Sequence, residues 1–261
     1  IGIGGSGMFP LVQIMQQRGY KITGSDNNES DTLALERAMG IDVMLGQRAE
    51  NIAGADLIVY TAAIMDDNPE LRAALVSGVP TVERAELLGF LTGLYKDCIC
   101  VCGTHGKTTT TAMLTQMLLG AGLDPTAVIG GKLPAIGGNG RAGESSLMVC
   151  EACEFKDHFL QLHPDLSVIL NVDADHLEYF GTIENIIKSF HKFADMTTRT
   201  IIVNGSDPNS MRAVEGINGK EIITFGWDEH FDYYPANIKR KGARAEFDLC
   251  CGGRALTHLT L

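Results

Sequence analysis

The residues best suited to bind phosphate lie in one glycine-containing loop, residues 103–111, which read Gly-Thr-His-Gly-Lys-Thr-Thr-Thr-Thr. The loop follows an apolar run and precedes a segment with the composition of a helix. Backbone N–H groups in such a loop converge on phosphate oxygens, and the helix N-terminus adds about half a positive charge. Lys107 can reach the outer phosphates of a nucleotide, and Thr108 or Thr109 can offer a hydroxyl to Mg²⁺. The first glycine is Gly103, so the loop is shorter than the common Gly-x4-Gly-Lys pattern.

Acids and a histidine follow two other apolar runs. Glu154 comes shortly after residues 146–150, and residues 171–176, Asn-Val-Asp-Ala-Asp-His, follow residues 168–170. Mg²⁺ prefers oxygen ligands and shares its coordination with phosphates and water. We therefore predict a Mg²⁺ site built from Thr108, Glu154 and His176. Three other acids at these strand ends are explained equally well as helix caps: Glu151, Asp173 and Asp175. His105 could bond phosphate or simply fill the loop.

A second glycine loop opens the chain. Residues 2–7 read Gly-Ile-Gly-Gly-Ser-Gly, and Asp26 lies about twenty residues further on, as in a dinucleotide-binding fingerprint. The pattern fits NAD, but it fits any diphosphate-linked nucleoside as well, because the loop binds pyrophosphate and the acid binds ribose or base. A glycine turn that only packs a strand on a helix is the structural alternative.

Composition narrows the classes of function. The 261 residues are 45% apolar and carry a net charge of −11, with no basic tract, which argues against a nucleic-acid partner. No apolar run is long enough to span a membrane, and no signal segment opens the chain. Among seven cysteines, Cys98, Cys100 and Cys102 alternate as on one strand face, and Cys150 and Cys153 form a single C-x-x-C. We expect free thiols and a reducing, cytoplasmic location.

Strand and helix patterns alternate through most of the chain, which predicts an α/β fold with largely parallel sheets and ligands at the carboxyl ends of the strands. We expect strands near residues 21–26, 56–60, 98–102, 127–129, 146–150, 166–170, 201–203 and 222–224. We expect helices over residues 11–17, 31–39, 70–76, 84–91, 112–119, 184–194 and 209–214. Residues 237–261 change to short alternating stretches, which predict an added antiparallel β region.

Together these motifs resemble the Mur ligases of peptidoglycan synthesis. That family has a Gly-Thr-x-Gly-Lys-Thr-Thr/Ser-Thr loop, a glutamate after the next strands, and an Asn-x-x-x-Asp-His element. Residues 103–110, Glu154 and residues 171–176 match these three features. Cys153 departs from the pattern, because many relatives have an acid before the glutamate. Within the family, both glycine loops and the Gly-Ser-Asp turn at residues 24–26 are similar to the branch that joins L-alanine to UDP-N-acetylmuramate.

The resemblance implies an ATP-dependent amide ligase with Mg²⁺ as cofactor and UDP-N-acetylmuramate, L-alanine and ATP as substrates. ATP would phosphorylate the sugar's carboxylate, and the amine of L-alanine would attack the acyl phosphate. It implies three catalytic residues: Lys107, Glu154 and His176. It implies two Mg²⁺ ions, one held by Thr108 and Glu154 and the second by His176. It implies an ATP site formed by Gly103, Thr104, His105, Gly106, Lys107, Thr108 and Thr109. It implies a UDP-substrate site formed by Gly4, Gly5, Gly7, Met8, Ser25, Asp26, Thr61, Ala62, Ala63, Gly130 and Gly131.

The resemblance also implies a domain plan. Residues 1–93 would form a Rossmann-like UDP-substrate domain and residues 94–261 a P-loop ATPase domain that is cut short. A third domain, which binds the amino acid, would be absent, so this chain is expected to be an inactive portion that only binds ligands. Two alternatives remain: a ligase that attaches a murein tripeptide to the same UDP-sugar, and an NAD-dependent oxidoreductase. The second leaves the phosphate loop unexplained.

Overall fold

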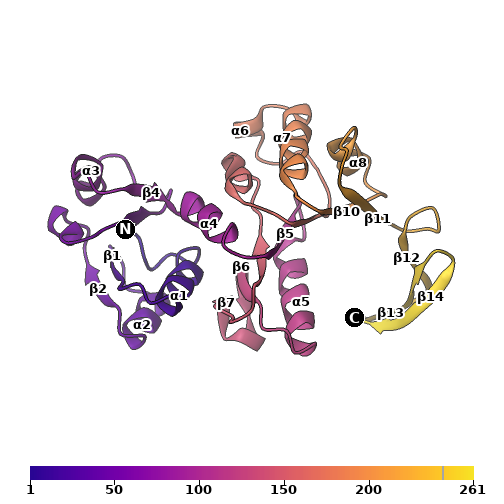
Figure 1. Ribbon diagram of the computed structural model, residues 1–261, viewed down its shortest axis with the longest axis horizontal. Helices are drawn as coiled ribbons and strands as arrows, with labels where there is room; N and C mark the ends of the chain where they lie inside the picture. Colours follow the sequence, from indigo (N-terminus) through magenta and orange to yellow (C-terminus); the bar gives the residue numbers. More distant parts are fainter. Residues whose placement is uncertain (243) are drawn as a thin grey trace. The chain divides into compact units, whose positions relative to one another are not determined.

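A computed structural model describes residues 1–242 and 244–261. The chain forms two compact units, one of residues 1–98 with 108–151 and the other of residues 99–107 with 152–261. The ribbon in Figure 1 follows the chain through both units. Strand β5 (Asp97–Cys102) and helix α5 (Lys107–Gly120) contribute residues to each unit. The phosphate loop joins these two elements, so the predicted strand–loop–helix arrangement is confirmed.

In the first unit, helices alternate with short strands, most of which pair in parallel. Besides α5, its helices are α1 (Phe9–Gln17), α2 (Asp31–Ala38), α3 (Pro69–Val76) and α4 (Arg84–Thr92), with short 3-10 turns η1 (Ala49–Ile52) and η2 (Pro134–Ile136). Its strands are β1 (Thr23–Asp26), β2 (Asp42–Leu45), β3 (Ile58–Tyr60), β4 (Thr81–Glu83), β6 (Thr126–Leu133), β7 (Gly138–Arg141) and β8 (Leu147–Glu151). The predicted helices are confirmed, and the Ser30 hydroxyl caps α2 by accepting from Leu33 N–H at 3.2 Å.

Short strands were the main omission of the sequence analysis in this unit. Strand β1 pairs with β2 in parallel, and β3 pairs with β4 in parallel, although β2 and β4 carry no clear alternation of apolar residues. The start of the chain pairs with both sets. The Ile1 nitrogen donates to Val59 C=O at 2.6 Å, and Gly2 N–H donates to Ser25 C=O at 2.8 Å. The first glycine loop therefore emerges between β1 and β3.

Strand β7 is a further element that the sequence did not predict, because Gly138-Asn-Gly-Arg141 is polar and rich in glycine. It pairs antiparallel with β6, which pairs parallel with β8. Strand β7 also packs on α1, and Asn139 Nδ2 donates to the carbonyl of Ser6, in the loop before that helix, at 2.6 Å. This contact connects the first glycine loop to a segment more than 130 residues later in the chain.

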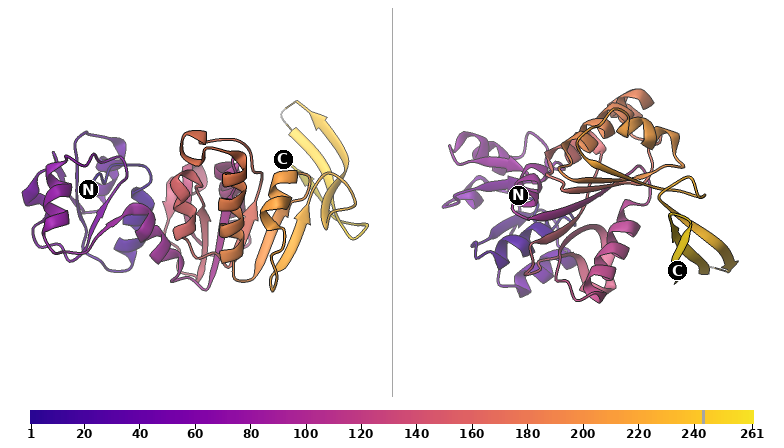
Figure 2. Two further views of the ribbon diagram at one scale, coloured as in Figure 1. Left: turned by 90° about the horizontal axis from the view of Figure 1, so that it is seen from above. Right: turned by 45° about the vertical axis from the view of Figure 1, so that its right-hand side comes forward.

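The second unit is a sheet with helices α6 (Leu177–Phe180), α7 (Ile183–Met196) and α8 (Pro208–Val214) and the 3-10 segment η3 (Phe155–Gln161). From β5 outward, its strands are β9 (Leu166–Ile169), β10 (Thr200–Asn204), β11 (Glu221–Phe225), β12 (Tyr233–Lys241), β13 (Arg244–Cys251) and β14 (Arg254–Thr260). Pairing is parallel from β5 to β12 and antiparallel from β12 to β14. The antiparallel region predicted near the end of the chain is thus confirmed (Figure 2).

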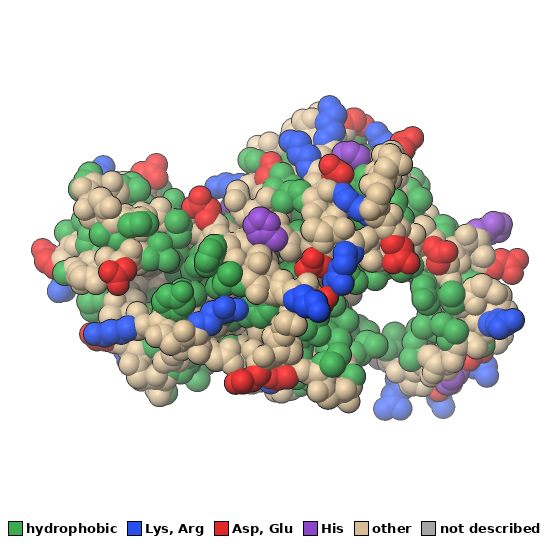
Figure 3. Space-filling view, in the orientation of Figure 1, with side chains coloured by type: hydrophobic (Ala, Val, Ile, Leu, Met, Phe, Trp, Pro, Cys, Tyr) green, Lys and Arg blue, Asp and Glu red, His purple; other side chains and the backbone are tan. Residues whose placement is uncertain are grey.

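The core of the second unit forms between α7 and η3. Phe159 stacks on Phe193 with ring centroids 4.7 Å apart and meets Phe190 edge-on at 5.2 Å. Cys98, Cys100 and Cys102 of β5 are fully buried, and all seven cysteines are free thiols, as expected. On the face seen in Figure 3, basic side chains are interspersed with acidic ones. Across residues 1–242 and 244–261, no helix has the length and apolar character needed to cross a membrane.

Candidate functional site

The phosphate loop is held close to the end of strand β9. Gly103 has φ +142°, and a Cβ there would lie 2.9 Å from Leu170 Cβ and 3.2 Å from the Asn171 nitrogen. Neither the backbone conformation nor the space admits a side chain, so glycine is required at this position. Helix α5 begins at Lys107, which places the loop's backbone N–H groups at a helix N-terminus.

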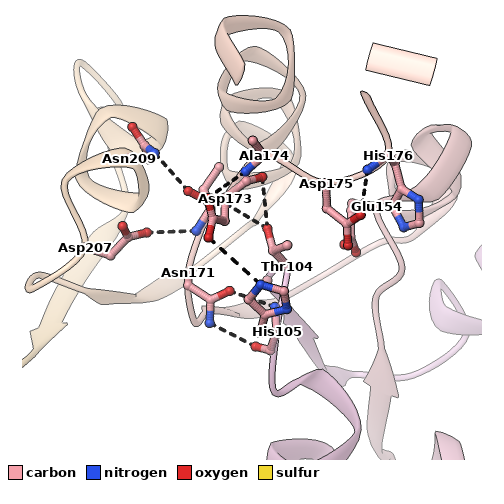
Figure 4. A network of polar contacts seen from close by, with 12 residues as sticks. Thr104, His105, Glu154, Asn171, Asp173, Ala174, Asp175, His176, Asp207 and Asn209 are labelled. Atoms are coloured by element: carbon pink, nitrogen blue, oxygen red, sulfur yellow. Dashed lines mark hydrogen bonds and ion pairs between the residues drawn. The ribbon is translucent and has the colours of Figure 1, made fainter. Parts of the chain in front are cut away.

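Asn171 fixes the loop through both ends of its side-chain amide. Its Oδ1 accepts from His105 N–H at 2.7 Å, and its Nδ2 donates to His105 C=O at 2.9 Å. Its own carbonyl accepts from Thr104 N–H at 3.0 Å, and the Thr104 hydroxyl accepts from Asp173 N–H at 2.8 Å (Figure 4). The Asn-x-x-x-Asp-His element therefore meets the phosphate loop directly. The His105 side chain is 69% exposed and lies 4.0 Å from the Asp173 carboxylate.

Helix α8 and its N-cap hold the Asn-x-x-x-Asp-His element, residues 171–176, through the backbone of Val172. The sequence analysis did not predict this role. Asp207 Oδ2 accepts from Val172 N–H at 2.8 Å, and Asn209 Nδ2 donates to Val172 C=O at 3.0 Å. Asp207 also caps α8 by accepting from Ser210 N–H at 3.1 Å. The signal was the Asp-Pro-Asn sequence at residues 207–209, shortly after the predicted strand at residues 201–203, because an acid before proline is typical of a helix N-cap.

Lys107 and Glu154 form an ion pair in the second unit. Lys107 Nζ donates to Glu154 Oε1 at 3.0 Å and lies 2.9 Å from Oε2, a second ion-pair contact without hydrogen-bond geometry. The two side chains are only 15% and 3% exposed. Burial, reinforced by the negative charge of Glu154, raises the pKa of the neighbouring Cys102 thiol, which therefore stays protonated. The structure thus brings together two of the three predicted catalytic residues.

His176 lies at the start of α6 with φ +51°, in the left-handed region. The His176 ring packs on Phe155, with centroids 4.7 Å apart, and Asp175 Oδ1 accepts from the backbone N–H of His176 at 2.8 Å. Among the residues that the structure describes, no three His, Cys, Asp or Glu side chains are grouped as a metal site. A metal here would need hydroxyl, phosphate and water oxygens in addition to these side chains.

Thr108 belongs to the first unit, where its hydrogen-bond partner is Glu151. Glu154, with which Thr108 is predicted to share a Mg²⁺ ion, contacts Lys107. The Thr108 hydroxyl donates to Glu151 Oε1 at 3.0 Å, and Gly130 N–H donates to Glu151 Oε2 at 2.7 Å. A Cβ on Gly130 would come within 2.5 Å of the same carboxylate. Gly131 is close to the Thr108 methyl group, so the glycine pair lies beside the phosphate-loop threonine. A carboxylate and a hydroxyl at this distance form a donor set that suits Mg²⁺.

The first glycine loop is supported by the end of strand β1. Asp26 Oδ2 accepts from Gly4 N–H at 3.0 Å, and Gly5 N–H donates to Gly2 C=O at 3.3 Å. Ser25 is fully buried, and its hydroxyl donates to the Glu70 carboxylate at 2.7 and 2.8 Å. This side chain therefore supports the loop from inside the protein. Met8 is also buried. Residues 61–63 follow β3, and Thr61 N–H donates to Ile1 C=O at 3.3 Å.

Arg84, the first residue of α4, is a cation beside this loop that the sequence analysis did not identify. A Cβ on Gly7 would lie 3.3 Å from both Cδ and Nε of Arg84. A guanidinium beside backbone N–H groups at the start of α1 is suited to a diphosphate. Its position depends on the pairing of β3 with β4, which no local pattern revealed.

Comparisons with known proteins agree with this arrangement. The model described as "Mur ligase family, catalytic domain" matches residues 1–96, and the model described as "Mur ligase middle domain" matches residues 101–260. A protein of Agathobacter rectalis named UDP-N-acetylmuramate--L-alanine ligase is 46% identical over 241 residues, which are 91% of this chain and 52% of that protein. The chain therefore spans about half the length of such curated relatives.

Solved structures with the same fold include two ligases. UDP-N-acetylmuramate-alanine ligase MurC from Thermotoga maritima matches with a TM-score of 0.85 and 28% identity, over 100% of this chain and 59% of that one. UDP-N-acetylmuramate:L-alanyl-gamma-D-glutamyl-meso-diaminopimelate ligase from Neisseria meningitides matches with a TM-score of 0.87 and 26% identity, over 99% of this chain and 85% of that one.

Proposed function

The chain belongs to the Mur ligase family, and from this premise we propose that it is the part of an ATP-dependent ligase that binds ATP and a UDP-sugar. The parent enzyme would join L-alanine to UDP-N-acetylmuramate in the cytoplasm. The observation that carries the proposal is the phosphate loop, whose backbone is fastened at His105 by Asn171 while Lys107 lies within it. The relatives named UDP-N-acetylmuramate--L-alanine ligase support the choice of substrates.

In the proposed reaction, loop N–H groups from Gly103 to Lys107 bind the phosphates of ATP, together with Thr108 and Thr109 at the start of α5. The sugar's carboxylate attacks the terminal phosphorus and displaces ADP, and the amine of L-alanine then displaces phosphate from the acyl phosphate. The protein contributes mainly by positioning the reactants and by neutralising charge. Lys107 supplies the positive charge beside the phosphoryl group during its transfer.

We propose Thr108 and Glu151 as ligands of one Mg²⁺ ion, because their oxygens already lie 3.0 Å apart. When bound there, the ion would neutralise phosphate charge. His176 remains the candidate for a second ion. Glu154, predicted to share this ion with Thr108, contacts Lys107.

We further propose that residues 1–93 bind the UDP-substrate and residues 94–261 bind ATP. The first glycine loop with Gly4, Gly5, Gly7 and Met8 would hold the diphosphate, and Arg84 would add a positive charge beside it. Asp26 would face the nucleoside with residues 61–63. Ser25 would hold the loop in place through its hydrogen bonds to Glu70. Gly130 and Gly131 would lie close to the sugar. Family membership leaves the oxidoreductase alternative without support.

The test is phosphate release by the longer parent protein. Release should require both UDP-N-acetylmuramate and L-alanine, and a folded parent that releases none with both substrates would overturn the proposal. A tripeptide ligase is the second candidate, because the Neisseria structure is also similar. Release with L-alanyl-gamma-D-glutamyl-meso-diaminopimelate, and not with L-alanine, would favour that activity.

A further inference from the structure

The Lys107 ammonium is fully bonded inside the phosphate loop. It donates to the Gly103 carbonyl at 2.6 Å, to the Thr104 carbonyl at 3.2 Å and to Glu154 Oε1 at 3.0 Å. An ammonium has three N–H donors, so these three acceptors satisfy it completely. A phosphate that binds Lys107 must therefore take the place of at least one of these acceptors.

Glu154 is the acceptor that carries charge. Its carboxylate is 3% exposed and contacts Lys107 through both oxygens, at 3.0 and 2.9 Å. A carboxylate this deeply buried requires a counter-charge, and Lys107 provides it. The contact with Lys107 also gives Glu154 a role that needs no metal ion.

The backbone two and three residues after Glu154 is strained, and such a conformation persists only where its surroundings maintain it. Lys156 and Asp157 have φ of +53° and +59°, a conformation that non-glycine residues rarely adopt. The Asp157 carboxylate accepts from the Tyr179 hydroxyl at 2.8 Å and from the Ser189 hydroxyl. The turn that carries Glu154 is therefore anchored to α6 and α7.

We propose that Glu154 is a positioning residue that holds Lys107 inside the phosphate loop until the phosphates of a nucleotide displace its carboxylate. The inference rests on the proposed nucleotide site. It assigns Glu154 to the lysine, whereas the sequence analysis assigned it to Mg²⁺. Because carboxylate and phosphate compete for one cation, the negative charge of Glu154 weakens the binding of phosphate.

The experiment measures affinities of the chain for inorganic tripolyphosphate, ATP and adenosine by calorimetry, each with Mg²⁺ and with EDTA. Glu154→Gln keeps the size of the side chain and removes its charge. We expect it to bind tripolyphosphate and ATP about tenfold more tightly in EDTA, because one unit of competing negative charge is removed from beside Lys107, with adenosine unchanged. Glu184→Gln, at an exposed glutamate of α7, should leave all affinities unchanged.

Other results would overturn the inference. Weaker binding by Glu154→Gln only when Mg²⁺ is present would make Glu154 a metal ligand. Weaker binding under both conditions would show that its charge supports phosphate binding, and no binding by either protein would reject the nucleotide site as well. If the predicted tightening is seen but the parent releases no phosphate, the ligase proposal alone fails.

A measurement on the unaltered chain covers the case in which Glu154→Gln does not fold. A crystal structure with tripolyphosphate bound should show Lys107 Nζ on a phosphate oxygen and separated from the Glu154 carboxylate. Both contacts intact beside a bound tripolyphosphate would contradict the displacement.

Discussion

Asn171 binds the backbone of His105 on both sides, accepting from its N–H at 2.7 Å and donating to its C=O at 2.9 Å. One side chain at the end of strand β9 thereby sets the course of a loop 66 residues earlier in the sequence. Helix α5 begins at Lys107, two residues after His105, so Asn171 holds the loop just before the helix starts. This pairing orders the phosphate loop from within the protein.

Asn171→Ala should bind ATP about tenfold more weakly, because two hydrogen bonds worth about 1 kcal/mol each no longer order the loop. Asn171→Asp should weaken binding at least as much, since its carboxylate cannot donate to His105 C=O and adds negative charge. Calorimetric titration with ATP measures both. Asn218→Asp changes an exposed turn and is the matched control. Unaltered affinity in Asn171→Ala would show that the two hydrogen bonds between Asn171 and His105 do not contribute to ATP binding.

Lys107→Met should abolish measurable ATP binding and also destabilise the fold. It leaves the Glu154 carboxylate buried without its counter-charge, which typically costs about 3–5 kcal/mol. Chemical denaturation measures the loss. Adding Glu154→Gln to Lys107→Met should recover part of the stability but none of the ATP binding. If the double variant is no more stable than Lys107→Met, the two residues are not coupled.

Thr108→Val should reduce the gain in ATP affinity that Mg²⁺ provides by at least about tenfold, because it removes the hydroxyl that lies beside Glu151. The loop motif alone admits either Thr108 or Thr109 as a metal ligand, and the predicted site takes Thr108. Thr109→Val is therefore both the control and the competing assignment. Titrations with Mg²⁺ and with EDTA separate them, and a loss seen only in Thr109→Val would reverse the assignment.

Arg84→Ala should weaken UDP binding about tenfold, since one charge-assisted hydrogen bond to an anion contributes about 1.5–3 kcal/mol. Arg72→Ala removes an exposed arginine from the same unit and should have no effect. Calorimetry with UDP and with uridine tests the reason. The loss should be confined to UDP, and an equal loss with uridine would mean that Arg84 does not contact phosphate.

Glu36 should make the stability of the first unit depend on pH. It is fully buried on the inner face of α2, and burial, together with the negative charge of Asp26, raises its pKa from 4.5 to about 7. Between these values the folded carboxyl keeps its proton while the unfolded one has lost it. Stability therefore falls as pH rises from 4.5 to 7, by at most about 3 kcal/mol. Glu36→Gln should remove this slope in urea unfolding, whereas Glu50→Gln, at an exposed residue, should retain it.

Local patterns predicted most of the elements and the place of the phosphate loop between a strand and a helix. An apolar run, the two loop glycines Gly103 and Gly106, and the start of a helix at Lys107 are close together in the sequence, so this phosphate-loop pattern can be recognised without tertiary information. Strands β2, β4 and β7 were missed because they are short. Strand β7 is also polar and rich in glycine, so it is a strand because of its pairing with β6 and not because of its own residues. Arg84 was missed because the sequence of α4 carries no motif that marks a ligand site, and only tertiary packing brings this arginine close to Gly7.

The sequence by itself determined the α/β class, the two glycine loops and the residue types available for phosphate and metal chemistry. Only the tertiary structure decided which acid serves which partner. Lys107 and Thr108 are consecutive, but side chains of consecutive helical residues point about 100° apart, so they meet different carboxylates. Thr108 meets Glu151 at the end of β8, and Lys107 meets Glu154 in the turn beyond it. The direction of that turn depends on long-range packing, which leaves no periodic signal in the sequence.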